Sequence, residues 1–210
     1  MEFSHKAISL VSGAQAWQKA KRKMQMLNIK TETGGDGDFL PWAKYNAKAG
    51  RWYVKTDGGS DEVSDPKFVI DFANIKTGWF HFEAGQAPSK VFDPDLSTAA
   101  EKPSEKHKRG FEVVLYGEQS FGGAVEFCST SALVGSVINE LYMQYDKEKA
   151  SNAGKLPVVE ANGASPSQSS HGTNYTPNLK ITKWVDVPAE LTGTVTSPSA
   201  PEVSTSASEF

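Results

Sequence analysis

The chain has 210 residues, of which 38% are hydrophobic and 10% aromatic, and its formal net charge is -3. This length allows one domain with extensions or two small domains, and the hydrophobic content is sufficient for a core. A single cysteine, Cys128, excludes an internal disulfide and any cysteine-based metal cluster, and no apolar run has the form of a secretion signal or a membrane span. We therefore expect a soluble cytoplasmic protein that has no contact with a membrane.

The charge is distributed unevenly. Residues 188–210 contain three glutamates and no basic residue, so the remainder of the chain is formally neutral. Two basic clusters stand out within it: residues 41–55 have four bases and no acid, and "KPSEKHKR" ends in Lys108 and Arg109. Such local patches attract an anionic partner whatever the total charge, although each patch also fits an ordinary solvated face.

The first element in chain order is a short basic helix predicted at about 13–27. Ser12 and Gln15 have the spacing of a capping box, and Ala14, Trp17 and Met24 follow at helical spacing. The glycines of "TGGDGD" then end the helix.

From residue 38 onward the pattern predicts β-strands. "DFLPWAKY" and "RWYVKT" are aromatic and β-branched runs separated by the turn-rich "NAKAG", which predicts a hairpin. In the second run, alternation directs Trp52 and Val54 to one face and Arg51, Tyr53 and Lys55 to the other.

Further strands are predicted at "KFVIDFANI" (67–75), at "TGWFHFE" (77–83) and in a hairpin of "GFEVVLYGE" and "GAVEFCS". Six aromatic residues are assigned to the core: Trp42, Trp52, Phe68, Phe72, Phe80 and Phe82. Five to seven short antiparallel strands with turns between them indicate a mainly β protein, either a small barrel or a sandwich.

The segment "SALVGSVINELYMQYDKEK" predicts a strong helix, because Val134, Val137, Leu141 and Tyr145 form one apolar stripe. Residues 84–109 and 151–177 have no periodicity and are expected to be long loops. "LKITKWVDV" (179–187) is the last predicted strand. The expected organisation is one domain over residues 1–187 and a disordered tail over 188–210.

No pattern for catalysis or for a cofactor is present. The sequence has no nucleophile elbow, phosphate-binding loop or dinucleotide fingerprint, and its four histidines lack metal-ligand spacing. We expect a protein without enzymatic activity or cofactor. The alternative is a nuclease that binds magnesium through Asp61, Asp65, Asp71 or Asp93.

The combination of aromatic and basic residues favours binding of single-stranded nucleic acid. Exposed bases stack on aromatic rings, and Lys and Arg attract the phosphates. The candidate residues are those predicted on exposed strand faces and in the basic loops: Lys44, Tyr45, Lys48, Arg51, Tyr53, Lys55, Trp79, His81, Lys108, Arg109 and Tyr116. A β-sandwich module that binds carbohydrate or protein, for example in a virion, is the alternative, because aromatic platforms also hold sugar rings.

Three phrases resemble phage-encoded single-stranded DNA-binding proteins with an OB-fold: "GDFLPWAKYNAKAGRWYVK", "FVIDFANIKTGWFHFEAG" and "NYTPNLKITKWVDVP". The resemblance covers residues 37–188. It implies an OB-fold with a helix inserted before a late strand, and sequence-independent binding of single-stranded DNA during phage replication or recombination in the host cytoplasm. The sheet face would bind DNA, with Lys108 and Arg109 on a mobile loop.

The resemblance also implies that the C-terminal tail recruits phage or host replication proteins. The tail here has few acidic residues, so Glu209 and the terminal Phe210 are the candidate contact residues. A remnant of cloning would look similar, because "EF" occurs near both ends of the chain.

Overall fold

The computed structural model describes residues 40–169 and 172–192, which all lie in the second of the two units into which the chain divides. The helix predicted at about 13–27 lies outside the described residues. Most of the described residues form β-strands: β1 (Trp42–Asn46), β2 (Arg51–Thr56), β3 (Gly59–Val63), β4 (Lys67–Ile70), β5 (Lys76–His81), β6 (Ser89–Phe92), β7 (Lys108–Gly117), β8 (Gly123–Ser129), β9 (Lys155–Ser169) and β10 (Gly172–Asp186). The prediction of a mainly β protein is confirmed.

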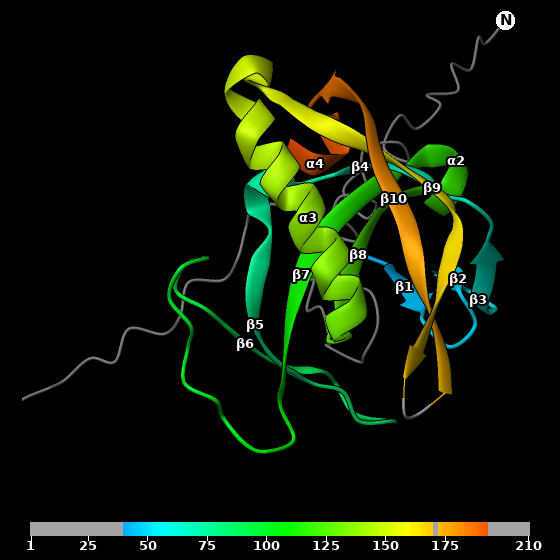
Figure 1. Ribbon diagram of the computed structural model, residues 1–210, viewed down its shortest axis with the longest axis vertical. Helices are drawn as coiled ribbons and strands as arrows, with labels where there is room; N and C mark the ends of the chain where they lie inside the picture. The colour runs from blue at the N-terminus through cyan, green and yellow to red at the C-terminus, as the bar shows by residue number, and fades with distance from the viewer. Residues whose placement is uncertain (1–39, 170–171, 193–210) are drawn as a thin grey trace, which may run out of the picture. The chain divides into compact units, whose positions relative to one another are not determined.

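These strands form one curled, open half-barrel sheet (Figure 1). Its order is β10-β9-β4-β7-β8-β1-β2-β3, with β5 and β6 attached beside β7. All pairs are antiparallel except β1 and β8, which run parallel through Trp42 and Ala43. The prediction of purely antiparallel pairing was therefore wrong, because β1 adds to the sheet beside a strand that comes about eighty residues later.

The described region contains ten strands rather than the predicted five to seven. Two of the additional strands, β3 and β6, contain no buried residue: β3 is almost entirely exposed, and β6 alternates between exposed and half-buried positions. Their sequences therefore lack the apolar alternation by which a half-buried strand is recognised.

The core lies on one face of the sheet and follows the predicted alternation closely. In β2, Trp52 and Val54 are buried while Arg51 and Lys55 are exposed. Phe68, Phe72 and Phe80 are buried as predicted. Trp42 and Phe82 were assigned to the core wrongly: they are 39% and 49% exposed.

One long helix, α3 (Ala132–Glu148), covers this face of the sheet and confirms the predicted helix (Figure 1). Its buried stripe is formed by Val134, Ile138, Leu141 and Tyr145, with Ile138 in the place predicted for Val137. The shorter helical segments are η1 (Phe72–Asn74), α2 (Glu118–Phe121), η2 (Lys149–Asn152) and α4 (Ala189–Thr192).

The segment 151–177 is not a long loop as predicted, because most of it belongs to the hairpin of β9 and β10 (Figure 1). In the Ser- and Gly-rich stretch from residue 162 to residue 178, most of the described side chains are exposed or half-buried, so the pairing of β9 with β10 is what defines the strands there. The hairpin bends back to the turn after β1. There the Tyr175 amide donates to the Ala47 carbonyl at 2.7 Å, and the Tyr45 hydroxyl donates to the Tyr175 carbonyl at 2.9 Å.

A second, smaller apolar cluster occupies the opposite face of the sheet, around Val69, Leu156 and Val158. Leu191 of α4 packs into it and is 2% exposed. The tail was predicted to be disordered from residue 188, and this was wrong for Ala189–Thr192, because a single leucine anchors the turn. Residues 193–210, with Glu209 and Phe210, lie outside the described residues.

Candidate functional site

Four of the candidate residues share the solvent-facing side of β1 and β2. Lys44 lies directly opposite Tyr53 in the hairpin register, and Arg51 and Lys55 flank Tyr53 on the same face. Trp42 also lies on this side, two residues before Lys44. We call Trp42, Lys44, Arg51, Tyr53 and Lys55 the outer face of the β1–β2 hairpin. Lys48, a further candidate, lies in the turn that joins the two strands.

The outer face carries cationic charge that the protein only partly neutralises. Arg51 forms an exposed ion pair with Glu62 of β3. Within residues 40–169 and 172–192, neither Lys44 nor Lys55 forms an ion pair, and both are exposed. Tyr53 is half-buried. In the sheet register, Tyr53 has Lys44 opposite it on β1, Glu62 opposite it on β3 and Lys55 two residues further along β2.

A pocket of about 540 Å³ continues from this face toward β8 and the β5–β6 hairpin. Trp42 and Lys44 of β1 line it, together with Phe82 and Pro88 from the segment between β5 and β6. The remaining lining residues are Ala43, Tyr45, Glu126, Cys128 and the hydroxyl residues of the segment 129–131. Trp42 and Phe82, which both line this pocket, are the two of the six predicted core aromatics that the structure leaves exposed.

Glu126 belongs to a partly buried charge cluster behind the pocket. The Lys90 ammonium donates to Glu112 and to Glu126, at 2.5 Å in each case. Burial by itself would lower the pKa of Lys90, but the hydrogen bonds to the two carboxylates outweigh it and raise this pKa. Lys90 therefore stays charged, and one ammonium serves two carboxylates.

The surroundings of Cys128 keep its thiol protonated. Burial is the main cause that raises its pKa to about 12. Cys128 lies directly opposite Glu112 in the sheet, so the carboxylate acts in the same direction as burial.

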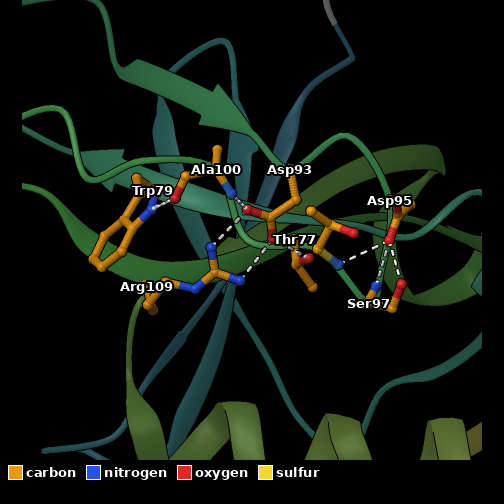
Figure 2. A network of polar contacts seen from close by, with 8 residues as sticks. Thr77, Trp79, Asp93, Asp95, Ser97, Ala100 and Arg109 are labelled. Carbon is orange, nitrogen blue, oxygen red and sulfur yellow. Dashed lines mark hydrogen bonds and ion pairs between the residues drawn. The ribbon is translucent and has the colours of Figure 1, made fainter.

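Arg109 and Trp79 are held in a separate polar network (Figure 2). The Asp93 carboxylate accepts two hydrogen bonds from the Arg109 guanidinium, at 2.7 and 2.6 Å, and one from the Thr77 hydroxyl at 2.5 Å. The Ala100 amide also donates to it at 2.9 Å. The hydrogen bonds from Arg109 are the largest cause that holds the pKa of Asp93 well below its ordinary value.

This network fixes the loop after β6. Trp79 donates from its indole nitrogen to the Ala100 carbonyl at 2.8 Å, so Ala100 is bound through both its amide and its carbonyl. The guanidinium of Arg109 lies 5.2 Å and the ammonium of Lys102 5.8 Å from the Trp79 ring. A base would have to displace one of these cations to stack there. Arg109 itself belongs to β7 rather than to the predicted loop.

The other candidates lie elsewhere. The rings of His81 and His107 are 5.5 Å apart, and Lys108 is exposed at the start of β7. Tyr45 is 7% exposed and packs on Trp52, so the structure makes it a core residue. Tyr116 lies in the apolar cluster with Leu191, and its hydroxyl donates to Glu118 at 3.3 Å.

The sequence reasoning missed Trp42 and Phe82 as surface residues, and a signal existed for only one of them. In β1, Trp42 points to the same face as the exposed Lys44, whereas Ala43 and Tyr45 point to the buried face. Strict alternation from residue 42 therefore predicts that Trp42 is exposed. Phe82 follows the last residue of β5, where alternation no longer applies.

Within the described part of the chain, no group of three or more His, Cys, Asp and Glu side chains is placed to hold a metal ion. Among the helices that the structure describes, none has the length and apolar character needed to cross a membrane. No family model matches the chain, and neither the search of curated proteins nor the search of solved structures found a match.

Proposed function

We propose that this protein binds single-stranded DNA along the outer face of the β1–β2 hairpin, as a non-catalytic protein of DNA replication or recombination. The observation that supports this most is the position of Tyr53 opposite Lys44 and two residues from Lys55, with Trp42 on the same face; neither lysine forms an ion pair within the described residues. A single strand presents flat bases and a charged backbone together, and this face offers a partner to each.

The fold is compatible with this proposal. We propose that the curled sheet is an OB-type barrel, which is a partly open architecture whose sheet face and loops bind oligonucleotides. The contacts of Tyr175 with Ala47 and Tyr45 join the β9–β10 hairpin to the β1–β2 turn. They hold the hairpin, and with it the outer face, in a fixed position relative to the rest of the sheet.

Substitutions on the outer face test the proposal. Tyr53→Ala removes one stacking ring and is expected to weaken binding of an oligonucleotide by about 1–3 kcal/mol. Lys44→Ala is expected to weaken binding less at moderate salt and to reduce the slope of log K against log salt by about 0.7, as for one lost phosphate contact. Both are measured by fluorescence anisotropy with a labelled single strand.

Lys147→Ala is the matched control, because Lys147 is an exposed lysine on α3, which packs on the other face of the sheet. It is expected to leave affinity and salt slope unchanged. If neither Tyr53→Ala nor Lys44→Ala changes the affinity, the outer face is not the binding surface. Binding of a neutral oligosaccharide that does not respond to salt would instead support a carbohydrate module.

A further inference from the structure

The pocket beside the outer face has the size and the lining of a ligand site. Its volume of about 540 Å³ falls within the range of about 300–1,000 Å³ that is typical of small-molecule pockets. Trp42 and Phe82 present half-exposed aromatic rings at it, which suits a flat, apolar ring system. Because Trp42 also belongs to the outer face, a strand bound there passes the pocket.

The charge in the pocket determines which part of a nucleotide fits. Glu126 lines the pocket with a side chain that is 34% exposed. Its carboxylate repels a phosphate, because Lys90 is shared with Glu112 and does not neutralise both acids. A carboxylate accepts up to about four hydrogen bonds, and Lys90 supplies one, to Oε1. The Glu126 carboxylate can therefore accept further hydrogen bonds, which favours a ligand group that donates rather than one that accepts.

Nucleobases differ in this respect. Cytosine carries an amino group at its fourth ring position, which donates to Glu or Asp, whereas thymine and uracil carry a carbonyl oxygen there, which only accepts. A carboxylate placed at the fourth ring position thus accepts from the amino group of cytosine and is repelled by the carbonyl oxygen of uracil. Lys44, at the junction of the pocket and the outer face, attracts the phosphate of the same nucleotide.

We propose that this pocket takes up one base of the bound single strand and selects a base with an exocyclic amino group, with Glu126 as the specificity-determining residue. This inference rests on the proposed function and adds a preference at one nucleotide to binding that is otherwise independent of sequence. The base lies between the rings of Trp42 and Phe82, its amino group donates to Glu126, and the phosphates follow Lys44 and Lys55.

The test compares labelled oligo-dC and oligo-dU of equal length, at one salt concentration and neutral pH, by anisotropy with the full chain. The two bases differ at the fourth ring position, which would meet Glu126, and at the adjacent N3, which accepts a hydrogen bond in cytosine and donates one in uracil. Oligo-dC is expected to bind about fivefold to tenfold more tightly, as for one hydrogen bond to a partly exposed charged group. In Glu126→Gln the ratio is expected to fall to about one, because an amide both donates and accepts.

Glu62→Gln is the matched control, because Glu62 is an acid on the neighbouring strand β3 that does not line the pocket. It should change the affinities for both strands equally and keep their ratio. Phe82→Ala, at a half-exposed position, removes one wall of the pocket and should also lower the ratio while the protein stays folded.

Equal affinity of the wild-type protein for the two strands overturns the pocket assignment and leaves single-strand binding intact. A preference for oligo-dC that survives Glu126→Gln also overturns it. Failure of the wild-type protein to bind either strand refutes the proposed function itself, and the inference with it.

Discussion

Asp93→Asn tests whether the network in Figure 2 holds the loop after β6. The Asp93 side chain is 3% exposed and receives two hydrogen bonds from Arg109. An asparagine removes the negative charge and replaces one carboxylate oxygen by an NH2 group, which cannot accept the hydrogen bonds that this oxygen receives. Breaking a fully buried ion pair costs about 3–5 kcal/mol. Because the Arg109 side chain is 42% exposed and regains water, we expect a loss of about 2 kcal/mol in the free energy of unfolding.

The assay is urea unfolding followed by tryptophan fluorescence, in which a lower midpoint at unchanged slope reports the lost stability. Asp95→Asn is the matched control, since Asp95 is an exposed acid of the same loop that accepts hydrogen bonds from Ser97 and Thr98. Asparagine can accept the same bonds, so we expect no measurable change. Wild-type stability of Asp93→Asn, or an equal loss in both variants, would refute the structural role of the network.

The pH dependence of this difference follows from the lowered pKa of Asp93. A carboxyl group whose pKa is depressed in the folded state contributes stability above its unfolded pKa of about 3.9, and the contribution is lost as the pH falls toward the folded pKa. The difference in stability between wild type and Asp93→Asn should therefore be constant near neutral pH and shrink below about pH 4. A difference that grows on acidification would contradict the sign of the pKa shift.

Three further predictions concern other positions. Tyr45→Phe removes the hydrogen bond to Tyr175 and should cost about 1 kcal/mol of stability in urea unfolding without weakening DNA binding. Gly110→Ala should prevent stable folding, because a Cβ there would lie 2.5 Å from the Ser129 carbonyl oxygen. Gly135→Ala, in α3 with open space around it, should instead raise the melting temperature, because alanine has the higher helix propensity. Cys128, with its pKa raised to about 12, should react with iodoacetamide at pH 7 far more slowly than the thiol of an unfolded peptide does. Mass spectrometry measures the rate of alkylation.

The sequence predicted the elements in which burial alternates regularly. Trp52 and Val54 in β2, and the stripe of α3, follow the periods of a strand and a helix, and both were placed correctly. β9 and the first half of β10 were missed. The start of β9 buries Leu156, Val158 and Val159 in a run without strict alternation, and the Ser, Gly and Pro residues that follow carry no apolar period, so that pairing with each other defines the strands there.

The candidate site was predicted in part for a similar reason. Alternation within one strand correctly directs Arg51, Tyr53 and Lys55 outward, and that local rule needs no knowledge of the fold. Whether a ring is covered depends on long-range contacts that a local pattern does not contain. Trp79 meets Arg109 through the pairing of β5 with β7 and Lys102 through the loop after β6. Tyr116 meets α4 from more than seventy residues away.

The central claim is single-strand binding by the outer face of the β1–β2 hairpin, and one measurement tests it most directly. Anisotropy of a labelled single-stranded oligonucleotide is compared with that of a duplex of the same length, at low and at high salt, with the wild-type protein and Tyr53→Ala. We predict tighter binding of the single strand, weakening as salt rises, and a clear loss of affinity in Tyr53→Ala. Absence of binding at low salt, or equal affinity for duplex and single strand, would contradict the account.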